Sequence, residues 1–372
     1  MRSEPRRSRS ALGTSCLAAA TLMLASCGTE GPNLPTGEPP DGSVITASAE
    51  SCALCYTHSF RGKGYDSAAS KGHLAELAQQ GYVAVSITNF GWMASATANE
   101  VTNGGSETPD AMRAAARDSA ERSIDVMLKP HLWVRDDSWR GDIAPSDWDA
   151  WFDSYQRFIV AQAQLAEEIG ASWFVVGLEL KSAVAQNATR WREIISAVRA
   201  VYRGKVTYAA NWDAVERVPF WDALDAVGIQ MFAPLSAAGT ASPPDQTALT
   251  EVAAGWLAKY RAVARAAGDK PLILTEAGFI NNEGATSAPY VWPEQTRVAK
   301  TAAGDEEQRR GYQALLDTFG RSPDVAAIYW WKWFSDPDDM QEGAVGFWPR
   351  GKPVEQLLRD LCAKRAAARA NR

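Results

Sequence analysis

Histidine is scarce in this chain, with three residues among 372, and this scarcity limits the chemistry that the chain can carry. A hydrolytic metal centre usually needs three or more His, Asp or Glu ligands. The chain has no H-x-H or H-E-x-x-H pattern, so we predict no metal. It also lacks a G-x-S-x-G elbow, a Walker loop and a strand followed by G-x-G-x-x-G. These absences argue against a serine hydrolase and against nucleotide cofactors, and we expect no cofactor.

Positive charge is also in short supply. The chain carries 38 Lys and Arg against 44 Asp and Glu, for a net charge of −6. Binding to nucleic acid requires a basic face that neutralises phosphates, so we expect no nucleic-acid partner.

Long apolar runs are absent apart from one near the N-terminus. Four arginines precede the apolar segment 11–24, an arrangement typical of an export signal and too short to span a bilayer well. The segment ends in Leu-Ala-Ser-Cys27, which resembles the bacterial lipobox. We therefore predict a signal peptide over 1–26, lipidation at Cys27 and a Gly- and Pro-rich tether over 27–47. An ordinary cleaved signal is the alternative. The prediction is an exported lipoprotein of the cell envelope, held to the membrane by its lipid alone. The sequence is compatible with the outer membrane or the cell surface and leaves the membrane face open.

Beyond the tether, apolar strands alternate with amphipathic helical segments. We expect strands at 52–60, 82–90, 125–133, 173–180, 206–212, 226–235, 271–279 and 327–334. Helical spacing covers 68–80, 111–123, 148–169, 190–202, 249–267, 306–319 and 354–368, with a short helical segment at 220–224. Eight such units predict an α/β fold, a single (β/α)₈ TIM barrel over residues 48–372, which we expect to be a monomer. A doubly wound open sheet is the alternative.

Three cysteines remain outside the export segment. Along an extended strand Cys52 and Cys55 would lie about 10 Å apart, too far for a disulfide. In a closed barrel the last helix ends beside the start of the first strand, which favours a bond between Cys52 and Cys362. Three buried thiols are the alternative.

Two glutamates end apolar strands in the same way. Residues 271–276 read PLILTE, and residues 174–179 read FVVGLE. Burying an unpaired carboxylate inside a strand is costly, whereas the C-terminal ends of barrel strands form the active site. Glu179 and Glu276 would face each other from the fourth and seventh strands. Two facing carboxylates are what glycoside hydrolysis requires.

Aromatic and polar side chains surround these glutamates in the predicted cleft. Flat indole rings suit the apolar faces of sugars, and nine of the 15 tryptophans lie at strand ends or in the following loops: Trp92, Trp133, Trp139, Trp212, Trp292, Trp330, Trp331, Trp333 and Trp348. Only one of the neighbours Trp330 and Trp331 can point inward. His58 follows the first strand, and we interpret it as a contact to sugar hydroxyls, with plain strand-end hydrogen bonding as the alternative.

Several motifs resemble glycoside hydrolase family 113, a family of retaining glycosidases that includes β-1,4-mannanases. They are KPH at 129–131, GLEL at 177–180, YAANW at 208–212, LTEAGF at 274–279, WKW at 331–333 and PRGKP at 349–353. The resemblance implies Glu179 as general acid/base and Glu276 as nucleophile. It implies substrate contacts from Lys129, His131, Asn211, Trp212 and Trp331, and we add Trp92, Phe232, Trp292 and Trp333 as cleft residues.

The chain departs from the family pattern at two positions. Phe232 stands where relatives commonly have a tyrosine bonded to the nucleophile, and Leu178 stands where many related enzymes have an asparagine that contacts the sugar. The expected function is retaining hydrolysis of a β-linked polysaccharide or oligosaccharide, foremost β-1,4-mannan. The alternative, favoured by Phe232, is a non-catalytic carbohydrate-binding lipoprotein with a degenerate site.

Overall fold

The computed structural model describes residues 50–293, 298–339 and 341–370. The predicted signal peptide, the lipidation residue Cys27 and the tether lie outside the described residues, so they stay predictions. None of the helices in the described part of the chain is both long and apolar enough to cross a membrane.

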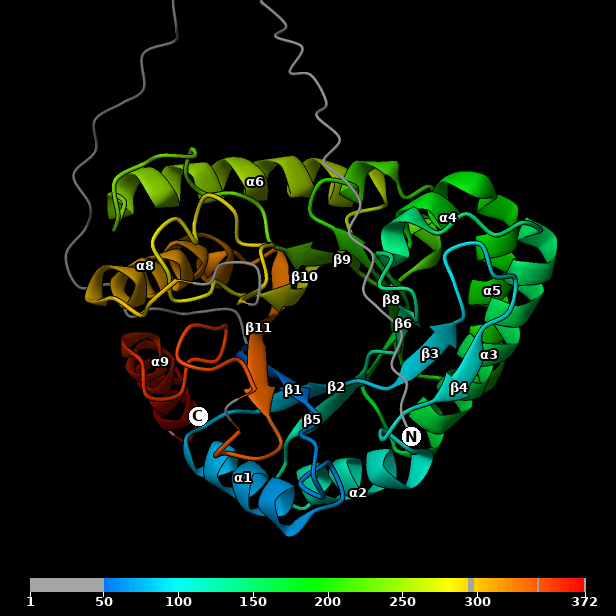
Figure 1. Ribbon diagram of the computed structural model, residues 1–372, viewed down its shortest axis with the longest axis horizontal. Coiled ribbons are helices and arrows are strands. Elements are labelled where there is room, and N and C mark those ends of the chain that lie inside the picture. The colour runs from blue at the N-terminus through cyan, green and yellow to red at the C-terminus, as the bar shows by residue number, and fades with distance from the viewer. Residues whose placement is uncertain (1–49, 294–297, 340, 371–372) are drawn as a thin grey trace, which may run out of the picture. The chain divides into compact units, whose positions relative to one another are not determined.

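Eight parallel strands close into a single barrel, which confirms the fold expected from the sequence (Figure 1). Around the barrel they are β1 (Glu50–Thr57), β2 (Ala84–Ile87), β5 (Asp125–Leu128), β7 (Trp173–Leu178), β8 (Lys205–Asn211), β9 (Val227–Met231), β10 (Leu272–Ala277) and β11 (Val325–Phe334). Pairing of β1 with β11 closes the ring. The strands are apolar along most of their length because the helices bury their outer faces and the barrel core buries their inner faces.

Helices surround the barrel on the outside, as Figure 1 shows. They are α1 (Ala68–Gln79), α2 (Pro109–Ala120), α3 (Trp148–Glu168), α4 (Lys181–Gln186), α5 (Ala188–Val201), α6 (Gln246–Ala266), α8 (Ala302–Thr318) and α9 (Pro353–Ala370). Short polar side chains cap their first turns: Thr108 precedes Pro109 at α2, and Asp147 accepts from Ala150 N at α3. Single 3₁₀ turns form η1 (Arg140–Asp142), η2 (Val215–Arg217), η3 (Trp221–Ala223) and η4 (Phe319–Arg321). The helical segment predicted at 220–224 is therefore only a 3₁₀ turn.

A second, three-stranded sheet extends two of the barrel strands beyond the barrel. Two non-strand residues interrupt each of the predicted strands 82–90 and 125–133, so that β3 (Phe90–Met93) follows β2 and β6 (His131–Val134) follows β5. These extensions pair in parallel, and β4 (Thr102–Gly104) adds an antiparallel edge. The sequence reading missed β4 because its three exposed residues carry no apolar pattern. His131 begins β6, so this second sheet holds it and the loop after β6 next to the C-terminal end of β5.

The end of the chain is tied to its first strand. Cys52 in β1 and Cys362 in α9 form a disulfide with their Cα atoms 5.6 Å apart. The turn at Gly81 passes close by: its φ is +87°, and a Cβ there would lie 2.8 Å from the carbonyl oxygen of Cys362. Only glycine meets both conditions without strain. Cys55 is a buried free thiol inside the barrel.

Candidate active site

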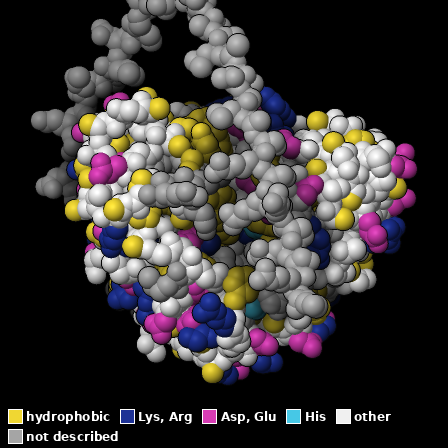
Figure 2. Space-filling model, in the orientation of Figure 1, with side chains coloured by type: hydrophobic (Ala, Val, Ile, Leu, Met, Phe, Trp, Pro, Cys, Tyr) yellow, Lys and Arg dark blue, Asp and Glu magenta, His cyan; other side chains and the backbone are white. Residues whose placement is uncertain are grey.

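A cleft of about 990 Å³ opens at the C-terminal ends of the barrel strands. Figure 2 shows hydrophobic side chains gathered around the hollow on this face. Both glutamates singled out in the sequence line it, together with exposed or partly exposed aromatic rings: Phe60, Phe90, Trp133, Trp139, Trp212, Tyr290 and Trp292. A concave, largely aromatic cleft with a few converging charges is the usual form of a small-molecule or sugar site.

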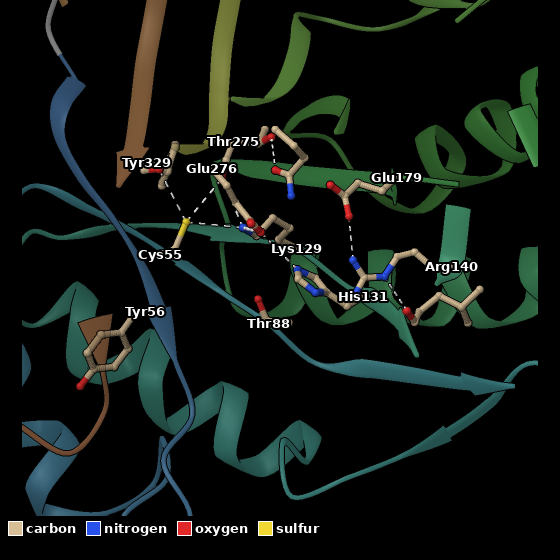
Figure 3. Close-up of polar contacts among 12 residues, drawn as sticks. Cys55, Tyr56, Thr88, Lys129, His131, Arg140, Glu179, Thr275, Glu276 and Tyr329 are labelled. Carbon is tan, nitrogen blue, oxygen red and sulfur yellow. Dashed lines mark hydrogen bonds and ion pairs between the residues drawn. The ribbon is translucent and has the colours of Figure 1, made fainter. Parts of the chain in front are cut away.

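Glu276 lies at the end of β10, with its side chain only 5% exposed. Burial alone would raise the pKa of its carboxyl group, but the positive charge of Lys129 and a contact with His131 outweigh it and lower the pKa to about 2. Figure 3 shows both side chains pointing toward Glu276. Glu276 is therefore a carboxylate at any ordinary pH, which is the state that a nucleophile needs.

Lys129 lies beneath Glu276, with no exposed surface. Its ammonium group is 2.5 Å from Glu276 Oε1, 3.2 Å from the carbonyl oxygen of Thr275 and 3.5 Å from Cys55 Sγ. These three acceptors use its three N–H donors. The cleft lining does not include Lys129. The expectation that Lys129 contacts substrate is therefore corrected, because its side chain extends into the barrel core and binds Glu276 instead.

Burial lowers the pKa of the His131 imidazole to about 4, although the nearby Glu276 carboxylate opposes this shift. Its Nε2 atom lies 3.6 Å from Glu276 Oε1, and the ring packs edge-on against Phe90. His131 lines the cleft as expected, and at neutral pH it is uncharged. A neutral imidazole there can offer a hydrogen bond to the nucleophile or to a sugar hydroxyl.

Glu179 follows β7 in a left-handed backbone conformation, with a φ of +53°. Its backbone N–H donates to the carbonyl oxygen of Ala209, and its side chain is 13% exposed. Such a conformation is uncommon for a residue with a side chain and is often found at functional positions. Burial raises the pKa of Glu179, Arg140 opposes the rise, and the charge of Glu276 adds to it.

Arg140 was not singled out from the sequence, yet it forms an ion pair with Glu179. Its Nη1 atom donates to Glu179 Oε2 over 2.8 Å (Figure 3). It belongs to η1, in the loop between β6 and α3. No periodic pattern marks this loop, so only its neighbouring tryptophans pointed to the cleft.

Glu107 is a further cleft carboxylate that the sequence reading missed. Its Oε1 atom lies 3.9 Å from Nδ1 of His58, which also lines the cleft and packs edge-on against Tyr65. The residue comes directly before the cap of α2, so its position resembled that of an ordinary helix start.

Aromatic rings form one wall of the cleft that Glu276 lines. Trp331 lines the cleft and meets Trp292 at right angles, and Trp292 meets Phe347 in the same way. Phe232 completes the wall against Phe347, with ring centroids 6.0 Å apart. Trp330 instead faces outward and stacks on Tyr312 of α8, as strand alternation requires. The peptide bond between Trp331 and Lys332 is cis.

Asn211 and Trp212 extend the cleft from the end of β8. Asn211 donates to Asp213 over 2.8 Å, and Asp213 also pairs with Lys181. Trp212 stacks nearly parallel to Tyr290, which is half exposed. Asn211 and Trp212 come from β8, the strand that pairs with β7 next to Glu179.

Two tryptophans expected in the cleft lie elsewhere. Trp92 belongs to β3, outside the barrel, where its indole N–H donates to Gly104 O and Arg135 lies over its ring. Trp333 is 2% exposed and packs against Tyr82, whereas its neighbours Lys332 and Phe334 line the cleft. The pairing of β11 with β1 shifts register between Trp330 and Trp333, so simple alternation from Trp331 does not place this residue. Neither tryptophan belongs to the cleft lining. Among the described residues no three His, Cys, Asp or Glu side chains are grouped closely enough to hold a metal ion.

The sequence and the fold are similar to those of known glycoside hydrolases. The family model described as Glycoside Hydrolase Family 113 matches residues 54–346. The β-mannanase AaManA from Alicyclobacillus acidocaldarius, solved in complex with ManMIm, is 24% identical with a TM-score of 0.73, over 87% of this chain and 100% of that chain. A β-1,4-mannanase of the same family is 25% identical with a TM-score of 0.71, over 84% and 99% of the two chains. No curated protein matches.

Proposed function

The chain belongs to glycoside hydrolase family 113 and is a glycoside hydrolase, and from this premise we propose that it cleaves β-1,4-linked mannan with retention of configuration. Glu276 is the proposed nucleophile and Glu179 the proposed general acid/base. The choice of mannan is supported by the similarity to two β-mannanases of the family.

The observation that carries the proposal is the opposite electrostatic environment of the two glutamates in one cleft. The pKa of Glu276 is lowered to about 2, whereas the pKa of Glu179 is raised. A pair of titratable groups whose pKa values are driven apart can act as one ionised and one protonated partner at the same pH. Glycoside hydrolysis by double displacement needs that combination.

In the first half-reaction the Glu276 carboxylate attacks the anomeric carbon of the sugar. The bond from that carbon to the glycosidic oxygen breaks, and Glu179 gives its proton to the departing oxygen. Lys129 and the neutral His131 hold Glu276 in place for the attack. Trp331 would lie under the reacting sugar.

In the second half-reaction Glu179 acts as a base. The ester at Glu276 has no negative charge, so the repulsion that helps to raise the pKa of Glu179 is gone. Glu179 takes a proton from water, the water oxygen bonds to the anomeric carbon, and the ester bond to Glu276 breaks. Both carboxyl groups return to their starting states.

The proposal is tested by measuring reducing ends released from β-1,4-mannan by the purified protein and by Glu276→Gln and Glu179→Gln. We expect each variant to lose at least about a hundredfold in rate, the scale of removing a positioned acid or base. Glu306→Gln is the matched control, because Glu306 pairs with Arg309 within α8, away from the cleft. A rate for Glu276→Gln equal to that of the control would exclude the proposed nucleophile.

A second candidate function is sugar binding without hydrolysis, and Phe232 is the observation that favours it. The phenyl ring cannot donate the hydrogen bond that a tyrosine would give to Glu276. If the wild-type protein and Glu276→Gln both bind oligosaccharides but neither releases reducing ends from a panel of β-glycans, this candidate is correct. Release of reducing ends by the wild-type protein alone supports the hydrolase.

A further inference from the structure

We propose that Arg140 is a positioning residue of the reaction: it holds the Glu179 carboxylate in place and stabilises it while it is ionised. Glu179 passes through that state between the two half-reactions. This inference rests on the proposed role of Glu179 as acid/base. It concerns a residue of the β6–α3 loop that contributes no group to bond making or breaking.

Two hydrogen bonds fix the guanidinium group of Arg140 in place. One guanidinium nitrogen, Nη1, donates to Glu179 Oε2 over 2.8 Å, and Nε donates to the carbonyl oxygen of Leu132 over 2.8 Å. The guanidinium carbon lies 5.6 Å from the centre of the Trp133 ring. The side chains of Arg140 and Glu179 are each 13% exposed. A planar guanidinium anchored at two points keeps its direction as well as its charge.

The charged and polar groups around Glu179 come from several elements. Glu276 faces it from β10, Tyr208 from β8, and the Trp139 indole from the segment just before η1. Lys181, the next cation along the chain, is paired with Asp213 at 3.0 Å. His131 is neutral at ordinary pH. Within the part of the chain that the structure describes, Arg140 is thus the cation in an ion pair with Glu179.

The ion pair between Arg140 and Glu179 has a role in the proposed reaction. When Glu179 releases its proton to the glycosidic oxygen, it becomes a carboxylate with 13% of its side chain exposed to solvent. An ionised group so poorly hydrated is costly unless it is paired. A guanidinium group is a permanent cation in proteins, so it stabilises the carboxylate without competing for the proton in transit. It makes Glu179 a stronger acid in the first half-reaction and keeps it ionised and aligned as a base in the second.

The experiment compares the pH dependence of kcat/KM on mannotetraose for the wild-type protein, Arg140→Met and Arg140→Lys. Without the positive charge the pKa of Glu179 rises, so the alkaline limb of the Arg140→Met profile should move up by about one pH unit or more. We expect kcat at the optimum to fall about tenfold or more, as when general-acid catalysis is impaired. Arg140→Lys retains the charge without the two-point anchor. Its alkaline limb should stay near that of the wild-type protein while kcat falls.

A leaving group that needs no proton separates this role from a structural one. With 2,4-dinitrophenyl β-mannoside, formation of the glycosyl-enzyme in Arg140→Met should slow far less than cleavage of mannotetraose. The matched control is Arg135→Met in the same loop, because Arg135 lies over the Trp92 ring, outside the cleft. Its alkaline limb should match the wild type.

The inference is overturned if Arg140→Met keeps the wild-type alkaline limb, or if it slows both substrates equally. If Arg140→Met does not fold, as judged by its circular dichroism, Arg140→Gln takes its place under the same criteria. Glu179→Gln distinguishes this failure from that of the proposed function. Loss of activity in Glu179→Gln with an unchanged limb in Arg140→Met rejects only the role of Arg140. Full activity in Glu179→Gln rejects the acid/base assignment itself.

Discussion

The ammonium group of Lys129 lies 2.5 Å from Oε1 of Glu276, and the pair is buried at the inner end of the cleft. Lys129 directly follows β5 and Glu276 belongs to β10, on opposite sides of the barrel. The other two N–H donors of Lys129 bind the carbonyl oxygen of Thr275 and Sγ of Cys55. The nucleophile proposed here thus has a fixed cation behind it and the substrate cleft in front.

Replacing Lys129 by methionine should impair both stability and catalysis. Removing one partner of a buried ion pair costs about 3–5 kcal/mol, so the free energy of unfolding should fall by that order. The pKa of Glu276 should rise, because Lys129 is what lowers it most, and the acid limb of kcat/KM should move to higher pH. Denaturant unfolding and a pH–rate profile measure the two effects. In Lys205→Met, the control at the opposite end of the barrel, the acid limb should stay where it is; an unmoved limb in Lys129→Met would contradict this account.

Replacing Phe232 by tyrosine should raise activity. Phe232 lines the cleft and packs against Phe347, and it stands where relatives commonly have a tyrosine bonded to the nucleophile. A hydrogen bond to a charged group contributes about 1.5–3 kcal/mol, and part of that should appear as a several-fold gain in kcat. Phe347→Tyr tests whether any added hydroxyl in the wall has the same effect. A loss of activity in Phe232→Tyr would mean that the apolar ring is itself needed for binding.

His131 should make the protein less stable in mild acid. The pKa of His131 is about 4 in the folded protein, against 6.5 for an unperturbed histidine such as that of the unfolded chain. The unfolded chain therefore takes up a proton first as the pH falls. The stability contribution is complete above pH 6.5 and is lost between pH 6.5 and 4, at up to about 1.4 kcal/mol per pH unit. His58 and His73, whose pKa values are also lowered, add to the same trend. In His131→Asn the free energy of unfolding, measured from pH 7 to pH 5, should fall less steeply; an unchanged slope would refute the assignment.

The barrel and the two glutamates were predictable from the sequence because both follow from local pattern. Apolar runs of strand length alternated with helical spacing, and in two of them the run ended in a glutamate. A polar residue at a strand end needs no knowledge of distant segments to be recognised. For Glu276 and Glu179 the strand register then brought both side chains to one cleft.

The partners of these glutamates were harder to predict because they depend on side-chain direction and on contacts far apart in the chain. Lys129 sits at a strand end like a substrate contact, but it points into the core toward a residue 147 positions away. Trp92 was misplaced because its strand leaves the barrel to join a second sheet. Arg140 comes from a 3₁₀ turn in a loop, where no periodicity indicates which side chain will turn toward Glu179.

The most direct test of the central claim is to trap the glycosyl-enzyme and find the residue that carries the sugar. The protein is incubated with 2-deoxy-2-fluoro-β-mannosyl fluoride, digested and mapped by mass spectrometry, with Glu276→Gln as the unreactive control. Fluorine at C2 slows both half-reactions, while fluoride leaves readily, so the intermediate should accumulate. We predict one labelled peptide, with the sugar on Glu276. A label on another residue, or a fully active protein that yields the inverted anomer and no label, would contradict the account.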